Sequence, residues 1–186
     1  MKLPPANRLD MTAFAWGFAE ATLFFIVPDV LLSYVGLMRG ARAGLRAAVI
    51  AAAGAACGGA LMFAWSAAAP EAARAAVLAI PAISEAMAAA AGAAMAQNWF
   101  AATLMGPLSS TPFKLFAILA PQAGAGLAAF AVAGFIARLP RFVLIALALA
   151  GIARWLGPFW GRRRLIWLLA GGWVLFYGVF FALMPN

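Results

Sequence analysis

The hydrophobic positions of the chain fall into long apolar runs separated by short polar or basic breaks. Residues 44–68 form an almost unbroken run, and residues 127–150 and 165–184 form two more of similar length. About 20 apolar residues in a helix cross the roughly 30 Å hydrocarbon core of a bilayer. The pattern therefore predicts a membrane-spanning helix in each of these three ranges.

Two other apolar segments, residues 12–38 and 93–125, are interrupted. The first contains Pro28 together with Glu20 and Asp29, and the second contains a polar break rich in proline. Proline removes a backbone donor and interrupts a helix, and a charge within hydrocarbon costs about 2.5–3.5 kcal/mol on insertion scales. A plain membrane anchor needs neither feature, so both segments are predicted to be broken helices, either kinked spans or re-entrant hairpins, whose breaks lie at membrane depth.

Two smaller features complete the predicted architecture. Residues 70–92 interrupt the apolar pattern with prolines and charges, and they are predicted to form a short amphipathic connector on the membrane surface. Gly54 and Gly58 are four positions apart in the first span, a spacing that lets helices approach closely. An alanine-rich composition also produces this spacing by chance, so both interpretations stay open.

The two halves of the chain resemble each other in the order of their elements. In each half a broken apolar segment is followed by a glycine-containing turn and then by a span. The breaks at Pro28 and Pro112 are 84 positions apart, as are the turns at Gly40 and Gly124. Paired interrupted segments in corresponding halves are typical of transporters, whose binding site lies between the repeats.

The distribution of basic residues indicates how the broken segments insert. If both are hairpins that enter and leave on one side, nine basic residues share one face and only Arg74 lies opposite. If both cross fully, the division is seven against three. Basic residues concentrate in cytoplasmic loops, so the count favours two re-entrant hairpins inserted from opposite sides. The prediction is one multi-pass membrane domain over residues 1–186, an inverted repeat with its N-terminus in the cytoplasm.

Composition supports an all-α integral membrane protein and excludes several kinds of chemistry. The chain is 67% hydrophobic and 10% charged, whereas soluble domains are about 45–50% apolar and 25% charged. Its net charge of +8 would point to nucleic acid in a soluble protein, but here the basic residues flank apolar runs and favour cytoplasmic anchoring. With no histidine and one cysteine, a His/Cys metal site and a Ser-His-Asp triad are excluded. We therefore expect no enzyme activity, metal or cofactor.

Five ionisable residues remain at membrane depth, namely Glu20, Asp29, Lys114, Arg138 and Arg141. The two arginines are three positions apart on a helix and face the same way. Their expected counter-charges are the two carboxylates, because an unpaired charge at this depth is costly. One positive charge remains in excess, which suits an anionic group such as phosphate, since arginine binds phosphate with a two-pronged fork. Further hydrogen bonds to such a group are expected from Ser109, Ser110 and Thr111.

The two carboxylates have alternative roles. A carboxylate at membrane depth can carry a proton, because burial and a neighbouring arginine act on its proton affinity in opposite directions. Glu20 is the stronger candidate because it lies among apolar neighbours, whereas Asp29 can instead cap the helix that follows Pro28. For the whole cluster, the alternative is that buried ion pairs only lock the hairpins in place.

Two stretches carry a resemblance to a known family. The first is Glu20 followed by Pro28-Asp29 and Gly36. The second, residues 110–142, contains a small-Pro-aromatic-Lys-x-Phe motif, a glycine-containing turn and Arg-x-x-Arg-Phe. Together they resemble motifs of the DedA family, also called the SNARE-associated or VTT-domain superfamily, over about residues 12–150. Lysine at position 114 and aspartate at position 29 stand where many members have arginine and glutamate.

The resemblance implies a fold and a function. It implies two opposed re-entrant hairpins with packed spans, and translocation of a phosphate-bearing lipid (polyprenyl phosphate or phospholipid) that depends on the proton motive force. Carried onto this chain, it implies that Glu20 and Asp29 couple transport to protons, while Lys114, Arg138 and Arg141 hold the headgroup. The expected setting is the bacterial inner membrane, with lipid and protons as partners. Assembly into a homo-oligomer is left open.

Two rival functions remain. The same residues would serve a proton-coupled transporter of ions or small solutes without a lipid substrate. Alternatively, the protein is a membrane assembly factor whose hairpins only bind partners, in which case the five buried charges are dispensable.

Overall fold

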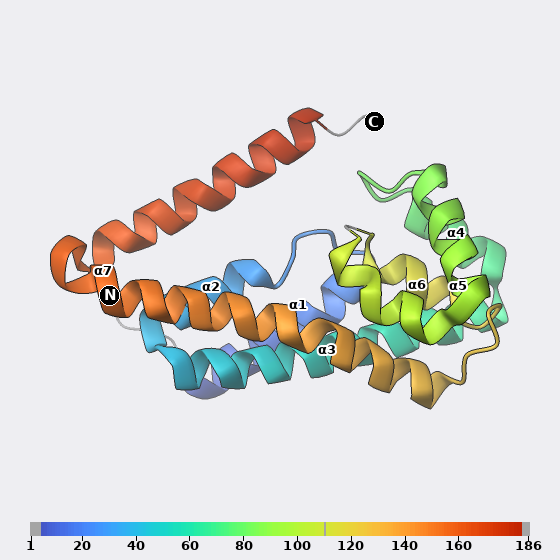
Figure 1. Ribbon diagram of the computed structural model, residues 1–186, viewed down its shortest axis with the longest axis horizontal. Coiled ribbons are helices and arrows are strands. Elements are labelled where there is room, and N and C mark those ends of the chain that lie inside the picture. The colour runs from blue at the N-terminus through green and yellow to red at the C-terminus, as the bar shows by residue number, and fades with distance from the viewer. Residues whose placement is uncertain (1–4, 110, 184–186) are drawn as a thin grey trace.

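The structure is a computed structural model that describes residues 5–109 and 111–183. Within these residues the chain is helical and contains no strand, which confirms the all-α prediction (Figure 1). The helices in chain order are α1 (Ala6–Ala21), α2 (Asp29–Arg39), α3 (Ala41–Ala68), α4 (Pro70–Leu78), α5 (Glu85–Met105), the 3₁₀ turn η1 (Gly106–Leu108), α6 (Phe113–Leu119) and α7 (Leu127–Leu183).

Helices α3 and α7 form the long axis of the molecule and run in opposite directions (Figure 1). Gly44 of α3 lies against Ala146 of α7, and Gly59 lies near Phe130, so residue numbers rise along one helix as they fall along the other. Both helices are long and apolar enough to cross a membrane. The sequence predicted apolar helices in both regions, and the presence of these helices is confirmed.

Helix α7 consists of two arms joined at Gly161, whose φ of 69° and ψ of 150° lie outside the helical region. The first arm is residues 127–160, and the C-terminal arm, residues 162–183, turns back from it (Figure 1). Glycine suits this turn because a positive φ is costly for other residues. The span predicted for residues 127–150 lies within the first arm, and the helix continues beyond it to residue 160, since no proline interrupts residues 141–157.

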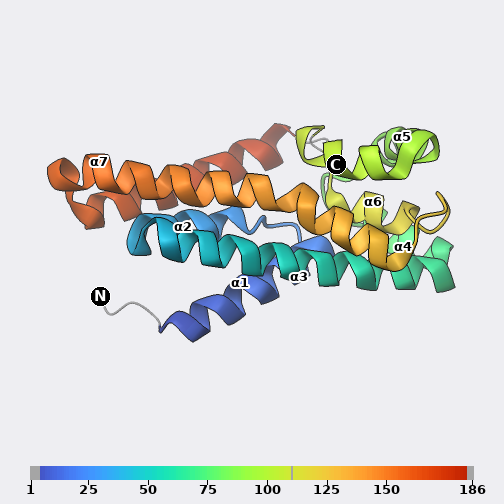
Figure 2. The same cartoon turned by 60° about the horizontal axis from the view of Figure 1, so that its bottom comes forward.

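The first broken segment is a helix, an irregular break and a second helix that returns. Gly54 and Gly58 of α3 lie against Phe14 and Phe18 of α1, so α1 runs parallel to α3. Gly40 alone joins α2 to α3, with a φ of 81° that reverses the chain. The outer ends of α1 and α2 therefore lie at the same end of the molecule (Figure 2).

The close helix approach predicted from Gly54 and Gly58 is confirmed. A Cβ atom at Gly54 would lie 2.1 Å from the carbonyl oxygen of Phe14, and one at Gly58 would lie 2.5 Å from that of Phe18. Backbones this close leave no space for a side chain, which is the usual use of small residues between membrane helices.

The second broken segment begins earlier than predicted. Residues 85–92 were assigned to a surface connector, but they form the first turns of α5, and only α4 and the turn at residues 79–84 connect it to α3. The Ser84 hydroxyl accepts a hydrogen bond from the Met87 N–H at 3.2 Å and so caps α5. The alanine-rich sequence that follows favours helix. Helix α5 then bends at Asn98, whose φ of −160° and ψ of 97° are not helical.

The two halves have corresponding elements at the positions where the sequence showed a repeat. Pro28 immediately precedes α2, and Pro112 immediately precedes α6. Gly40 and Gly124 both have positive φ, 81° and 75°, and each lies in the turn before a long helix. The order of a helix, a break, a short helix, a glycine turn and a long helix therefore occurs twice.

One end of the molecule is strongly basic. Arg46 forms an ion pair with Asp10 at 2.5 Å, and the Arg162 guanidinium donates to the Met38 carbonyl at 3.4 Å. These contacts bring the start of α1, the α2–α3 turn and the Gly161 turn together. The basic residues of this end are Arg8, Arg39, Arg42, Arg46, Arg154, Arg162, Arg163 and Arg164. In the described part of the chain, the opposite end carries Arg74, which pairs with Glu85.

Candidate functional site

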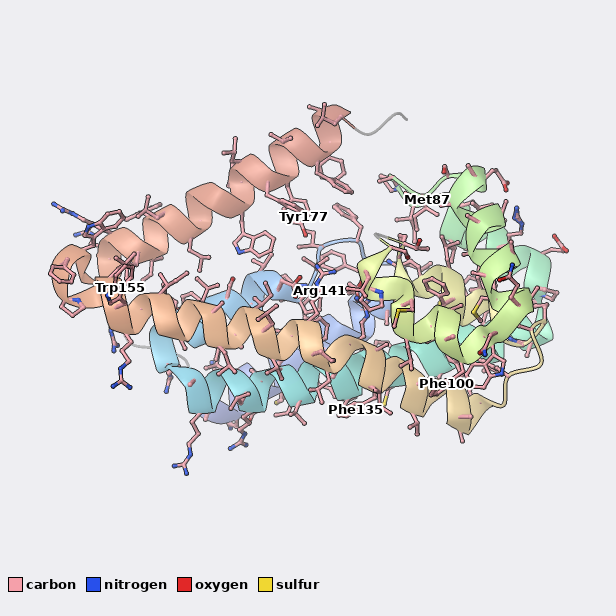
Figure 3. All side chains as sticks on the ribbon, in the orientation of Figure 1. Met87, Phe100, Phe135, Arg141, Trp155 and Tyr177 are labelled. Atoms are coloured by element: carbon pink, nitrogen blue, oxygen red, sulfur yellow. The ribbon has the colours of Figure 1, made fainter. Side chains whose placement is uncertain are left out.

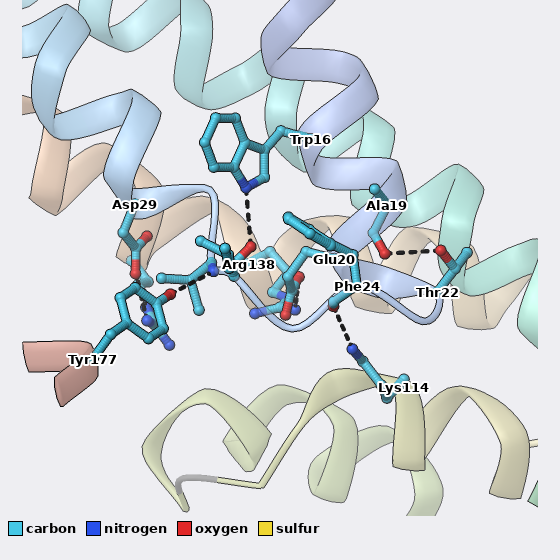
Figure 4. A network of polar contacts seen from close by, with 12 residues as sticks. Trp16, Ala19, Glu20, Thr22, Phe24, Asp29, Lys114, Arg138 and Tyr177 are labelled. Atoms are coloured by element: carbon cyan, nitrogen blue, oxygen red, sulfur yellow. Dashed lines mark hydrogen bonds and ion pairs between the residues drawn. The ribbon is translucent and has the colours of Figure 1, made fainter. Parts of the chain in front are cut away.

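The breaks of the two halves meet in the middle of the molecule. The Lys114 ammonium, on the first turn of α6, donates a hydrogen bond of 2.7 Å to the Phe24 carbonyl oxygen in the first break (Figure 4). Lys114 is only 2% exposed. The contact therefore gives a backbone carbonyl of the irregular first break a hydrogen-bond partner from the other half of the chain.

The first ion pair of the site joins α1 to α7. The Arg138 guanidinium contacts the Glu20 carboxylate, and both side chains are at least 93% buried. The guanidinium also lies over the Phe113 ring, 5.0 Å from its centroid, a distance that permits a cation–π interaction. Glu20 lies on the last turn of α1, so the pair lies beside the break.

The second ion pair joins α2 to α7 one helical turn farther on. Arg141 Nε donates to Asp29 Oδ2 at 2.9 Å, and Nη2 of the same guanidinium contacts the same oxygen. Asp29 is buried, whereas the Arg141 side chain is 40% exposed. The prediction that the two arginines find their counter-charges in Glu20 and Asp29 is confirmed. Asp29 is the first residue of α2, and its side-chain hydrogen bonds go to Arg141 rather than to the helix end.

The site retains hydrogen-bonding capacity that the described residues do not use. Within them, Asp29 Oδ1 and Arg138 Nε are buried and have no partner. Lys114 forms no salt bridge with any carboxylate of the described chain. The site therefore holds three cationic side chains and only two carboxylates, and a buried polar group without a partner costs roughly 1–3 kcal/mol. An anionic ligand would supply the missing acceptors for the cations.

Three aromatic side chains with polar groups hold the first break and the helix after it, and the sequence analysis did not identify them as site residues. Trp16 Nε1 donates to the Ile26 carbonyl at 2.9 Å, and the Tyr177 hydroxyl accepts from the Val27 N–H at 2.9 Å (Figure 4). Trp173 Nε1 donates to the Ser33 hydroxyl at 3.0 Å. Aromatic residues with a polar group, such as Trp173 and Tyr177, are also typical of a membrane interface. Their i, i+4 spacing, which places both on one helix face, is the signal that was available.

The serine and threonine cluster of the second break contributes less than predicted. Thr111 lines the central cavity, but the Ser109 hydroxyl donates to the Gly106 carbonyl at 2.9 Å within its own turn. Ser110 lies outside the described residues. Pro112 lines the cavity and precedes α6, so its predicted role in ending the break fits its position.

A cavity of about 460 Å³ opens beside the ionic cluster. Its polar lining comprises Glu20, Thr111, Lys114, Arg138, Arg141 and Tyr177. In Figure 3, Tyr177 points from the C-terminal arm toward Arg141, and Met87 lies across the same space. The cavity is thus bounded by both breaks, by both arms of α7 and by the start of α5.

The ionic cluster lies between two apolar clusters of the core. Along α7, Phe130 belongs to the cluster built around α6, and Phe142 belongs to the one built around α1 and α2. Arg138 lies between these two positions. In comparisons with protein-family models, curated proteins and solved structures, no match to the chain was found.

Proposed function

We propose that this protein is a membrane transporter, a flippase for a lipid with a phosphate headgroup. The headgroup binds between the two breaks, where Lys114, Arg138 and Arg141 neutralise its charge. Glu20, together with Asp29, exchanges protons during the cycle, so that transport depends on the proton motive force. The hydrocarbon tail extends from the cavity toward the bilayer.

The observation that carries the proposal is a group of three cations and two carboxylates that borders a cavity between apolar helices, all of them buried except the partly exposed Arg141. Ionisable side chains inside a membrane are costly, and they usually mark a substrate or proton pathway. Among the described residues, the buried Arg138 Nε has no acceptor, and an anionic ligand would supply one. An excess of cationic side chains favours an anionic ligand over a cationic or neutral one.

The same proposal includes a topology. We propose that the two broken segments are re-entrant hairpins inserted from opposite sides, related as an inverted repeat. The repeated order of elements, with Pro28 and Pro112 before corresponding helices, supports this view. The basic end of the molecule would face the cytoplasm by the positive-inside rule. The DedA-like motifs in the sequence agree with this arrangement, and the bacterial inner membrane is the setting that they imply.

The function can be tested by reconstitution into liposomes. Purified protein is expected to accelerate the movement of fluorescent phospholipids or of a polyprenyl phosphate to the opposite leaflet. An imposed proton gradient is expected to increase this rate further. Arg138→Ala and Glu20→Gln are each expected to reduce this rate at least tenfold. Arg46→Ala is the matched control, because Arg46 also forms an ion pair but is 64% exposed at the basic end.

The outcomes separate the proposal from its rivals. Unchanged translocation in folded Arg138→Ala and Glu20→Gln proteins would refute a role for the ionic cluster. Uptake of inorganic phosphate or another small anion without lipid movement would favour a solute transporter. The double variant Glu20→Gln/Arg138→Met keeps the test valid if single variants unfold, because it removes both charges of the pair together.

A further inference from the structure

Most of the wall of the central cavity is apolar, although one part is charged. Much of the apolar lining comes from the first break, the turn before α5, the start of α5 and the C-terminal arm of α7, and it includes Phe25, Ile80, Ile83, Met87, Phe176 and Phe180. Phe176 is 52% exposed and Phe25 is 37% exposed. Large aromatic surfaces in the cavity are therefore left uncovered by the described residues.

The charged and apolar parts of the wall adjoin along the C-terminal arm. Tyr177 lies at the boundary, because its hydroxyl accepts from the Val27 N–H of the first break and its ring lies among the neighbouring phenylalanines. Phe180 lies one helical turn farther from Gly161 on the same face. Phe25 extends this aromatic surface through its contact with Phe181, with ring centroids 5.4 Å apart.

The size of the cavity exceeds what an anionic group alone requires. Its volume is about 460 Å³, within the roughly 300–1,000 Å³ of pockets that hold drug-sized ligands. Such pockets combine a mostly apolar lining with a few polar groups that fix orientation. This cavity has that composition, with cations at one part of the wall and aromatic and aliphatic side chains over the remainder.

We propose that the apolar lining is a binding site for the first part of the hydrocarbon chain of an anionic amphiphile. The head of this ligand contacts Arg141 and Lys114, and the chain atoms next to it lie between the C-terminal arm and the turn at residues 79–84. The inference rests on the proposed function and adds to it: the chain enters the bilayer only beyond this site, and chain length contributes to selectivity.

The experiment uses full-length protein in amphipol and a series of n-alkyl phosphates from methyl to octyl, with inorganic phosphate alongside. Isothermal titration calorimetry measures each Kd. Affinity is expected to rise by up to about fourfold for each methylene that becomes buried, and then to level off once the lined part of the cavity is filled. Octyltrimethylammonium, with the same chain and the opposite charge, is expected to bind at least tenfold more weakly than octyl phosphate.

Variants identify the surface responsible. Phe176→Ala/Phe180→Ala is expected to remove most of the chain-length dependence while leaving the Kd of methyl phosphate within about twofold. Leu175→Ala/Val179→Ala is the matched control, because these residues adjoin the two phenylalanines but do not line the cavity. Phe176→Leu/Phe180→Leu retains apolar side chains and should keep the dependence. Circular dichroism and gel filtration establish that each protein is folded.

Each outcome decides between the two proposals. If alkyl phosphates of all lengths bind as tightly as inorganic phosphate, the chain site is refuted and the anion site stands. If octyltrimethylammonium binds as tightly as octyl phosphate, or if both pairs of variants lose the dependence equally, the chain site is also refuted. If no phosphate compound binds, the headgroup site of the proposed function fails, and the chain site fails with it.

Discussion

At the scale of single residues, the buried Arg138–Glu20 pair is the feature whose disruption is expected to cost the most stability. Both side chains are buried, and removing one partner of a buried pair typically costs about 3–5 kcal/mol because the other charge is left uncompensated. Replacing both partners with residues of similar volume is often neutral. Stability measurements can therefore separate what the pair does for folding from what its charges do for transport.

Glu20→Gln is expected to destabilise the protein by about 3 kcal/mol or more, because Arg138 loses its counter-charge. Glu20→Gln/Arg138→Met should recover most of this loss while remaining inactive in translocation. Thermal unfolding of the detergent-solubilised protein measures both. Arg46→Gln serves as the control, since Arg46 is 64% exposed and exposed pairs contribute only about 0–1 kcal/mol, and a loss there as large as at Glu20 would contradict the assignment.

Tyr177→Phe removes the acceptor of the Val27 N–H in the first break. Leaving a half-buried donor without its partner is expected to cost about 1–3 kcal/mol and to increase hydrogen exchange at residues 22–28. Tyr34→Phe is a natural control, because the Tyr34 hydroxyl has no hydrogen bond among the residues that the structure describes. Mass spectrometry of peptides from the two variants measures this exchange. Equal exchange at residues 22–28 in both variants would contradict a role of the Tyr177 hydroxyl in holding the first break.

The charged part of the site could be predicted from the sequence, whereas its aromatic part could not. Glu20 and Asp29 could be recognised as site residues because a carboxylate within an apolar segment requires a partner. Few cations lie at a matching depth, so the partners could be predicted as well. Trp173 and Tyr177 gave no such signal, since an aromatic residue with a polar group is equally typical of a membrane interface. Their partners are a backbone N–H and a hydroxyl, which no residue pattern distinguishes.

At the scale of helices, close backbone contact between α1 and α3 fixes the first hairpin. Gly17 and Gly54 occupy positions where a Cβ atom would lie 2.1 Å from a carbonyl oxygen of the facing helix. Without a hydrophobic driving force between helices in lipid, such packing contributes much of their association. A single methyl group at this interface should therefore displace one helix from the other.

Gly54→Ala is expected to lower the unfolding temperature, since the helices must separate to admit the new methyl group. Gly172→Ala is the matched control in the C-terminal arm, where a Cβ atom would meet nothing within 4 Å. There the change should raise stability by roughly 0.5–1 kcal/mol, because alanine is the better helix former. Thermal unfolding of the two variants should thus shift in opposite directions, and a decrease in both would contradict this packing.

The presence of the long helices and of the breaks could be predicted from sequence better than the residues at which the helices begin and end. Apolar runs of sufficient length indicated α3 and α7, and proline with buried charge indicated the breaks. The start of α5 at Glu85 was missed because its charge and the preceding Pro81 resemble a surface segment, while the Ser84 cap acts only locally. The continuation of α7 past residue 150 was missed because interfacial arginine is compatible with both helix and loop.

At the scale of the whole molecule, charge asymmetry and the hairpin topology make a joint prediction. In a Cys57→Ala background, Asn7→Cys and Arg42→Cys should both react with a membrane-impermeant maleimide from the cytoplasmic side only. Ala72→Cys should react from the opposite side only. Labelling of Asn7→Cys and Arg42→Cys from opposite sides would show that the first segment crosses the bilayer fully.

Gly161 is the single residue that joins the C-terminal arm to the rest of α7. At a rise of 1.5 Å per residue, Tyr177 lies about 24 Å along a continuous helix from this pivot. A rotation of only 10° at the pivot would therefore sweep the tyrosine through roughly 4 Å, farther than its 2.9 Å hydrogen bond to Val27 reaches. A small rotation at the basic end would therefore be enough to separate the arm from the centre of the protein.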